Sequence, residues 1–318
     1  MAQTALAPTE SMSRREQSWV YFNGDFHRYS EVKLGLMTHA LHYGTGCFEG
    51  IRAYWNAERQ QLYAMRLSEH YDRMQKSARI LRLGMPHSTL ELCEITRELL
   101  RRNEMREDAY VRPLCFKAGE EIGVRLHDVA DAFAIYIAPM GPYIGLSGIR
   151  CMVSSWRRME DTMAPVRAKC TGLYINSALA KTEAMEAGCD EAIVLTHEGH
   201  VSEGSAENIF IVRKGRFITP PPSDNILEGI TRDTVIFLIE EELGLEVVER
   251  SVDRTELYVA DEVIMCGTGA QVAPVVEIDG REVANGKPGP LAQRLQSMYH
   301  DICLGLNAKY IDWVTPVY

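Results

Sequence analysis

The residue of this sequence with the clearest chemical potential is a lysine in a short segment of small residues. Lys169 lies in AKCTG (168–172), after Pro165 and before a helix expected over 175–187. A lysine on a loop among small neighbours can reach inward. Once desolvated, its amine can attack a carbonyl group and form a Schiff base. The alternative is a solvated lysine at a strand-to-helix turn.

Two carboxylates lie among glycine, serine and alanine in VSEGSAEN (201–208), between strands expected over 191–196 and 209–212. If Glu203 points into the protein it needs a partner, because an unpaired buried charge is costly. A pyridinium N–H would be such a partner. A Schiff-base lysine and a carboxylate for a ring nitrogen together are what pyridoxal 5'-phosphate (PLP) requires. The alternative is that Glu203 caps a turn.

A phosphate site would complete this set, and two loops could supply it. LEGITRD (227–233) leads into a helix expected over 233–243, and the N–H groups at a helix N-terminus bind phosphate. Thr231 adds a hydroxyl, although such a motif also occurs as an ordinary helix cap. CGTGA (266–270) follows a strand expected over 262–265 and offers further N–H groups and the Thr268 hydroxyl.

The elements around these loops alternate between helices and strands. Helices are expected over 66–83 and 89–103, the second opened by a capping box of Ser88 and Glu91. In the strand expected over 109–117, Tyr110 and Arg112 face the same side because they are two residues apart. The glycines and charges of residues 118–130 predict a loop. We predict a mobile tail (1–16), a small N-terminal domain (17–143), a linker (144–148) and a large domain (149–318).

The composition excludes several classes of function. The chain has 318 residues, enough for two domains, and its net charge of −10 without a basic run argues against nucleic-acid binding. No stretch is apolar enough for a membrane span or a secretion signal, and the eight cysteines form no C-x-x-C. Cys170 has no visible His–Asn partners, and His197 and His200 lack further metal ligands. We therefore expect a cytoplasmic protein with small-molecule partners and no metal.

Six stretches carry a resemblance that covers nearly the whole chain. They are HALHYGTGCFEGIRAY (39–54), AYVRPL (109–114), AKCTGLYINSALAKTEA (168–184), VSEGSAENIF (201–210), LEGITRD (227–233) and LYVADEVIMCGTGAQVAPV (257–275). The sequence resembles the class IV (fold-type IV) PLP aminotransferases and, among them, the branched-chain amino acid aminotransferases. This resemblance implies a mixed α+β / α/β fold with a smaller N-terminal α/β domain and a larger C-terminal pseudo-barrel domain. It also implies PLP bound as a Schiff base to Lys169, and transamination between L-leucine, L-isoleucine or L-valine and 2-oxoglutarate.

The resemblance also implies roles for individual residues. The implied cofactor-binding residues are Arg73, Lys169, Tyr174, Glu203, Leu227, Gly229, Ile230, Thr231 and Thr268. The implied substrate-binding residues are Tyr43, Phe48, Tyr110, Arg112, Val124, Met140, Tyr143, Thr268, Gly269 and Ala270. Arg112 would take the distal carboxylate of glutamate or 2-oxoglutarate. The loop over 118–130 would reach the active site of a neighbouring subunit, in a homodimer at least or a hexamer built as a trimer of dimers.

One position departs from the pattern of some relatives, which have an aromatic residue where Met140 stands. Because methionine is flexible, we expect a more permissive pocket, which leaves the exact substrate open. The alternatives within the same fold are a transaminase of D-amino acids or (R)-amines and an aminodeoxychorismate lyase. Two further alternatives are a Schiff-base aldolase without PLP and a non-catalytic PLP carrier.

Overall fold

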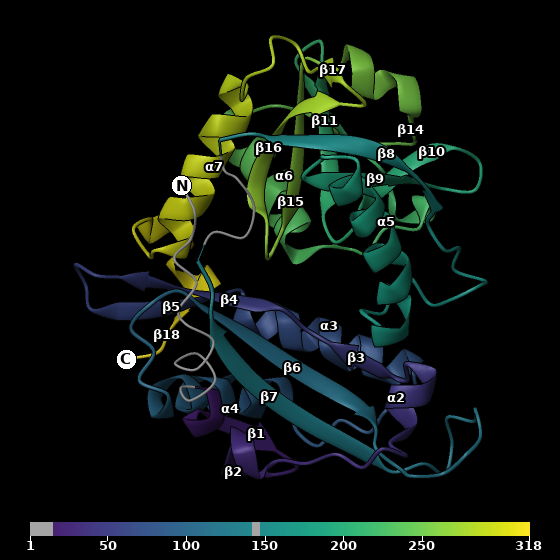
Figure 1. Cartoon of the computed structure of the whole chain (residues 1–318). Coiled ribbons are helices and arrows are strands. Elements are labelled where there is room, and N and C mark those ends of the chain that lie inside the picture. Colours follow the sequence, from purple (N-terminus) through teal and green to yellow (C-terminus); the bar gives the residue numbers. More distant parts are fainter. Residues whose placement is uncertain (1–14, 142–146) are drawn as a thin grey trace. The chain divides into compact units, whose positions relative to one another are not determined.

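The computed structural model describes residues 15–141 and 147–318, and it divides the chain into two compact units (Figure 1). The described part of the first unit comprises residues 15–139 and 315–318. The second unit contains the described residues between 140 and 314. Each unit has its own sheet.

The first unit is an eight-stranded sheet in the order β18-β5-β4-β6-β7-β1-β2, with β3 paired to β6. Its strands are β1 (Trp19–Phe22), β2 (Asp25–Arg28), β3 (Gly46–Phe48), β4 (Ile51–Asn56), β5 (Gln61–Met65), β6 (Ala109–Lys117), β7 (Asp131–Pro139) and β18 (Val314–Pro316). Its helices are α2 (His39–Tyr43), α3 (Leu67–Ile80) and α4 (Thr89–Arg102), with the 3-10 helix η1 (Tyr29–Glu31).

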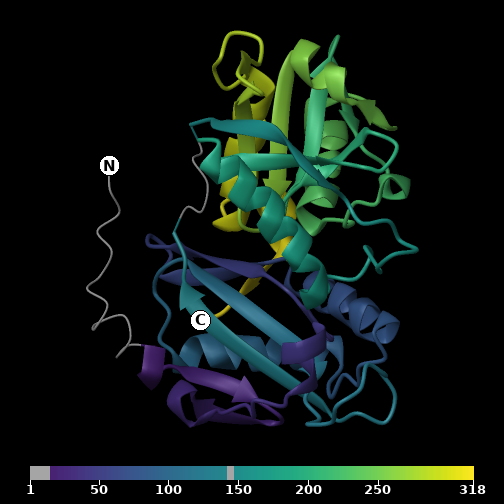
Figure 2. The ribbon, with the colours of Figure 1, turned by 45° about the vertical axis from the view of Figure 1, so that its right-hand side comes forward.

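Helices α3 and α4 pack on each other and on the sheet, behind the strands as seen in Figure 2. The predicted capping box is confirmed at the start of α4, where Ser88 and Glu91 exchange side-chain and backbone hydrogen bonds. The buried residues Leu92, Leu99 and Leu100 follow helical spacing and turn one face of α4 inward. Helix α3 packs on β3, which pairs with β6, and these two strands carry several of the predicted substrate-binding residues.

The second unit is a ten-stranded sheet in the order β13-β12-β11-β15-β16-β8-β9-β10-β14, with β17 paired to β16. Its strands are β8 (Ile149–Arg157), β9 (Glu191–Leu195), β10 (His200–Gly204), β11 (Asn208–Arg213), β12 (Arg216–Thr219), β13 (Val247–Glu249), β14 (Val252–Asp253), β15 (Glu262–Gly267), β16 (Gln271–Ile278) and β17 (Arg281–Glu282). Its helices are α5 (Tyr174–Glu186), α6 (Ile230–Leu243) and α7 (Pro290–Cys303). Its 3-10 helices are η2 (Thr171–Leu173), η3 (Pro222–Asp224), η4 (Arg254–Val259) and η5 (Ala308–Trp313).

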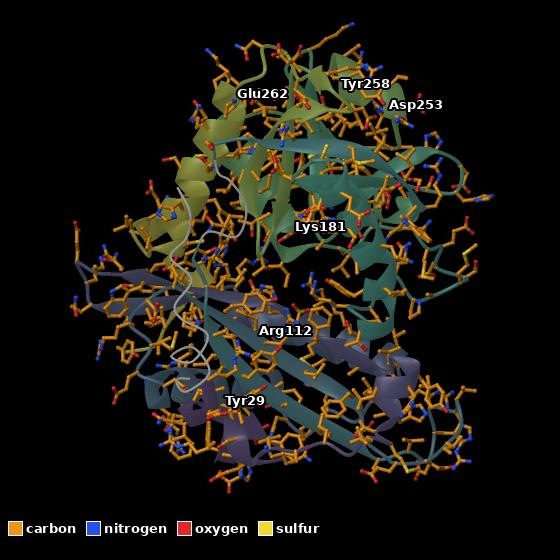
Figure 3. The ribbon with its side chains drawn as sticks, viewed as in Figure 1. Tyr29, Arg112, Lys181, Asp253, Tyr258 and Glu262 are labelled. Carbon is orange, nitrogen blue, oxygen red and sulfur yellow. The ribbon has the colours of Figure 1, made fainter. Side chains whose placement is uncertain are left out.

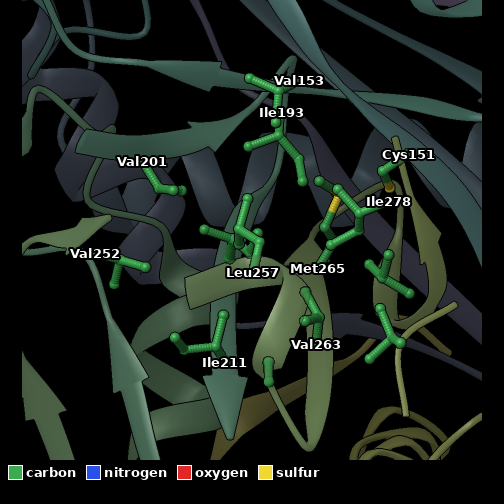
Figure 4. Close-up of a cluster of buried hydrophobic side chains, with 14 of the residues drawn as sticks. Cys151, Val153, Ile193, Val201, Ile211, Val252, Leu257, Val263, Met265 and Ile278 are labelled. Atoms are coloured by element: carbon green, nitrogen blue, oxygen red, sulfur yellow. The ribbon is translucent and has the colours of Figure 1, made fainter. Parts of the chain in front are cut away.

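One hydrophobic cluster fills the inside of this second sheet (Figure 4). Every second residue of a strand points into it, as with Val263 and Met265 in β15. Val201 from β10 and Ile211 from β11 share the cluster although their strands are far apart in the sheet order. The sheet therefore curls around its core like an incomplete barrel.

The helices of the second unit cover the outside of this sheet. Helix α5 lies against β8 and β9, where Ala180 and Ala184 pack on Ala192 and Val194. Small side chains on both surfaces let the helix approach the strands closely. Helices α6 and α7 pack on β15 and β16. The expected mixed fold is confirmed.

Two boundaries differ from the sequence-based expectation. Residues 201–204 form strand β10, whereas they were expected to lie between strands. The pattern hid this strand because Ser202 and Glu203 are polar yet buried. Residues 315–318 pack with the first unit rather than the large domain, since β18 pairs with β5. The predicted tail (1–16) and linker (144–148) lie outside the described residues except for 15–16 and 147–148.

Candidate active site

Lys169 points at a tyrosine of its own unit. It lies between the buried residues Ala168 and Cys170, just before η2, and its Nζ donates a hydrogen bond to Tyr174 Oη at 2.8 Å. Tyr174 begins α5, so the helix fixes the position of the phenol. The amine is thus held at a defined place inside the second unit, next to a phenolic oxygen.

Glu203 is buried in β10 and is bound on both carboxylate oxygens. Arg158 Nη2 lies 2.8 Å from Oε1, which makes a buried ion pair. Oε2 accepts hydrogen bonds from Asn208 Nδ2 at 3.1 Å and from the Leu227 backbone N–H at 3.0 Å. The guanidinium compensates the buried charge, so the carboxylate can remain anionic away from water.

Hydrogen bonds connect the lysine segment to this carboxylate. Asn176, two residues after Tyr174, donates from Nδ2 to the carbonyl of Arg157 at 3.1 Å. The next residue, Arg158, reaches Glu203. Asn208 then bridges Glu203 and the Leu227 carbonyl, at 2.9 Å from the latter. Hydrogen bonds therefore join Glu203 to the loop that precedes α6, and Asn176 connects helix α5 to the residue before Arg158.

Helix α6 presents its N-terminus at the end of this network. Its N-cap is Gly229, with no side-chain cap, and Ile230 and the buried Thr231 form the first turn. The turn of Thr268, Gly269 and Ala270 joins β15 to β16. It follows Cys266, which pairs with Asn208 in the sheet. Both predicted phosphate loops are thus connected to Asn208, and a helix N-terminus with a threonine hydroxyl suits an anion.

The donor set of the second unit fits a phosphorylated pyridine aldehyde. The amine of Lys169 matches the aldehyde, and the Tyr174 phenol matches a ring hydroxyl. Glu203 matches a protonated ring nitrogen, while the N-terminus of α6 with Thr231 matches a phosphate. These groups all belong to the second unit.

Gly229 gives the first testable prediction, because a methyl group there would clash with Asn208 Oδ1. We expect Gly229→Ala to lower the free energy of unfolding by about 1–3 kcal/mol, as overpacking does. Denaturant unfolding measures this change. Gly141→Ala is the control, since an added Cβ there meets nothing within 4 Å. Equal stabilities of the two variants would contradict the tight fit at Asn208.

In the first unit, three predicted substrate-binding residues meet on β3 and β6. Arg112 Nη2 donates to Tyr110 Oη at 2.7 Å, which agrees with the expectation that both side chains face the same side. The Arg112 guanidinium carbon also lies 4.4 Å from the centre of the Phe48 ring. Gly50 is required beside them, because a Cβ there would clash with the Tyr110 hydroxyl.

Two further predicted residues lie near Gly123. The Gly123 N–H donates to Tyr43 Oη at 3.3 Å, and its carbonyl accepts from His39 Nε2 at 2.7 Å. Val124, the next residue, is 77% exposed. The loop that was expected to reach a neighbouring subunit is thus fixed to α2 at Gly123, with an apolar side chain left in solvent.

Arg73 of α3 binds a buried carboxylate in its own unit. Its Nε and Nη2 lie 2.7 and 2.8 Å from the two oxygens of Glu49, which also bonds His70 Nδ1 at 2.8 Å. Burial alone would raise the pKa of Glu49, but Arg73 and His70 hold that pKa well below its ordinary value. Arg52, also buried, places its Nη2 3.4 Å from Asp108 Oδ2.

The comparisons with known proteins decide the family. Residues 46–278 match the family described as amino-transferase class IV. The chain belongs to this family. It is 49% identical to the "Probable branched-chain-amino-acid aminotransferase" of Aquifex aeolicus, over 94% of this chain and 97% of that one.

Solved structures of class IV aminotransferases agree with this assignment. The branched-chain aminotransferase of Thermoproteus uzoniensis with norvaline has a TM-score of 0.91 and 44% identity, over 95% of this chain and 99% of that one. The T.th. branched-chain amino acid aminotransferase complexed with N-(5'-phosphopyridoxyl)-L-glutamate has a TM-score of 0.90 and 42% identity. The match again covers 95% of this chain and 99% of that one.

Some residues of this class IV aminotransferase were not predicted, and one prediction stays outside the described residues. Arg158 and Asn208, which bind Glu203, were missed; the only signal was a basic pair at the end of a strand. Met140 is half-buried at the start of the second unit. Tyr143 is not among the described residues. No helix in the described part of the chain has both the length and the apolar character of a membrane span.

Proposed function

We propose that the protein is a PLP-dependent branched-chain amino acid aminotransferase. It would exchange the amino group between L-leucine, L-isoleucine or L-valine and 2-oxoglutarate, giving branched 2-oxo acids and L-glutamate. The observation that carries this proposal is that one unit holds both Lys169, bonded to Tyr174, and the ion-paired Glu203, and that Asn176 of the lysine segment bonds the residue before Arg158. The relatives named above support the substrate class, and the phosphopyridoxyl-L-glutamate complex of one of them supports both cofactor and amino-group acceptor.

The residues proposed to hold PLP come mainly from the second unit. Lys169 would bind it covalently, Tyr174 would contact its phenolic oxygen, and Glu203 would keep its ring nitrogen protonated. Leu227 would pack on the ring, and the phosphate would be held by Arg73, Gly229, Ile230, Thr231 and Thr268. When bound, PLP supplies an electron sink for negative charge that develops at the substrate Cα.

The chain's own groups would then orient the substrate and move its proton. The Lys169 amine removes the proton from Cα, as a general base. The backbone N–H groups of Thr268 and Gly269, beside Ala270, bind the α-carboxylate together with the Tyr110 hydroxyl. Arg112 binds the distal carboxylate of glutamate and 2-oxoglutarate by its planar fork. The apolar side chain of leucine is bounded by Tyr43, Phe48, Val124, Met140 and Tyr143.

The proposal includes an assembly and a location. We propose that the protein forms a homodimer at least and acts in the cytoplasm. The loop over 118–130 would then contribute Val124 to the active site of the neighbouring subunit. Sedimentation of the purified enzyme would separate a dimer from a hexamer.

The visible spectrum of the holoenzyme tests the proposed function. We expect a yellow cofactor band that is lost on addition of L-leucine and returns with 2-oxoglutarate. D-Leucine and a racemic amine serve as competing substrates. A band that responds to these and not to L-leucine would replace the proposal by a D-amino-acid or (R)-amine transaminase. No band after adding PLP would contradict the cofactor assignment.

A further inference from the structure

Two buried carboxyl groups in the second unit have no part in the proposed chemistry. Glu191 begins β9 with 1% of its surface exposed, and Glu207 precedes β11 with 4% exposed. Their side chains are hydrogen-bonded to each other. Two carboxylates only accept hydrogen bonds, so this contact requires a proton on one of them.

The charged and titratable groups around the pair cannot neutralise both carboxyls. Lys181 reaches in from α5 (labelled in Figure 3) and places its Nζ 2.6 Å from Glu191 Oε2. The Cys151 thiol of β8 and the Cys266 thiol of β15 also face Glu207. Burial raises the pKa of Cys151 well above its ordinary value and that of Cys266 to about 12, so both thiols stay neutral. The positive charge of Lys181 therefore compensates the negative charge of one carboxylate, and Lys181 bonds Glu191.

Glu207 is folded back into the turn that carries the candidate site. Its Oε2 accepts from the Ala206 N–H at 3.0 Å, and its carbonyl accepts from the Gly204 N–H at 2.6 Å. A Cβ on Gly204 would lie 3.0 Å from Oε2, a contact so tight that the Glu207 side chain would have to shift. The residues that flank this turn are Glu203 and Asn208, the carboxylate and the amide of the network described above.

We propose that Glu207 is protonated at neutral pH and donates its carboxyl O–H to Glu191, and that this buried bond is a positioning contact for the turn between Glu203 and Asn208. The contacts of Glu191 with Lys181 and Glu207 then connect α5, β9 and this turn. The protonation of Glu207 follows from its burial and from its contact with Glu191, and it does not depend on the proposed reaction. The consequence for the cofactor rests on the proposed function, because it acts through Glu203.

Protonation of Glu207 predicts how the stability of the folded protein changes with pH. Burial, and next the charge of Glu191, raise the pKa of Glu207 from 4.5 to about 8. The folded state therefore holds a proton that the unfolded state releases near pH 4.5. This contribution to stability is complete below pH 4.5 and is lost as the pH rises to about 8. Above that pH, two buried carboxylates face one lysine, and the turn loosens.

Glu207→Gln tests the protonation, because an amide donates to Glu191 at every pH. Thermal unfolding of the PLP-free protein is measured from pH 6 to pH 9. We expect the midpoint of the natural protein to fall across this range and that of Glu207→Gln to stay more nearly level. Glu198→Gln, on an exposed turn, is the control for replacing a glutamate by glutamine. Parallel curves for the natural protein and Glu207→Gln would overturn the proposal.

An infrared difference spectrum provides a direct second measurement. At pH 7 the natural protein minus Glu207→Gln should show the carbonyl band of a protonated carboxylic acid, and this band should disappear by pH 9. A carboxylate band at pH 7 would also overturn the proposal. Neither measurement depends on activity, so both stand if the proposed reaction is wrong.

The positioning role is tested on the holoenzyme. Glu207→Ala should raise the dissociation constant of PLP about tenfold, the effect of losing one buried hydrogen bond, while Glu207→Gln retains near-normal binding. Near-normal PLP binding by Glu207→Gln would show that residue 207 acts by positioning the turn and needs no negative charge. If Glu207→Ala binds PLP normally although its infrared and thermal results agree with the proposal, the buried bond does not position the turn, and that part is overturned.

Discussion

Lys169→Ala is expected to reduce transamination between L-leucine and 2-oxoglutarate by at least about 10⁴-fold. The variant loses both the amine that holds the cofactor and the base at the substrate Cα, and general-base catalysis alone contributes about 10²–10⁴-fold. Lys169 is half-buried, and its Nζ bonds the Tyr174 phenol. Glutamate formation from leucine and 2-oxoglutarate measures the change.

The fold should survive this substitution, which makes the result interpretable. Circular dichroism should match that of the natural protein, and so should thermal unfolding when both proteins are freed of PLP. Lys287→Ala, on an exposed loop, controls for the loss of one lysine. A Lys169→Ala enzyme that keeps a tenth of the natural rate would show that the lysine is not the catalytic base.

Glu203→Gln is expected to lower kcat by about 100-fold or more, with a smaller change in the KM for leucine. The glutamine keeps the size of the side chain and can still accept from Asn208 and Leu227. It no longer provides the negative charge proposed to keep a ring nitrogen protonated. Removing one well-placed electrostatic group from an active site commonly costs about 10²–10³-fold in kcat.

Arg158→Gln is the matched comparison for this result, because it breaks the same ion pair from the other side. Breaking a buried pair costs about 3–5 kcal/mol in either variant, so both should unfold more easily. Only Glu203→Gln removes the carboxylate itself, and we expect it to lose more activity than Arg158→Gln. Equal losses in kcat would mean that Glu203 acts through the stability of the ion pair alone.

The sequence predicted the parts of this site that lie within short continuous segments. Lys169 and Tyr174 are five positions apart in one segment, and the loop and the helix were predicted from its small and apolar residues, although the short η2 between them was not. The start of α6 was predicted a few residues late, because LEGITRD has no side-chain cap to mark the boundary. Local composition was sufficient to predict those site residues that lie close together in the sequence.

The parts that could not be predicted depend on contacts between distant segments. Arg158 is useful only because β8 and β10 lie on either side of β9, so that its side chain reaches Glu203, and nothing in its neighbourhood in the sequence indicates a buried partner. Strand β10 was missed since its polar residues find their partners in other elements, such as the carbonyl of Asp224 for Ser202. The polarity of this segment suggested a loop, but in the folded protein its polar side chains are buried and hydrogen-bonded.

The position of β18 has a consequence for how the chain folds during synthesis. The first unit needs Thr315 and Pro316 to cover the edge of β5, yet these residues follow the whole second unit in the chain. Domains usually fold from the N-terminus as they emerge. Here, the first unit would wait with an unpaired strand edge, a surface prone to wrong pairing, while the whole second unit is made. Translation that stops just before residue 314 would yield a second unit that is nearly complete and a first unit that is not.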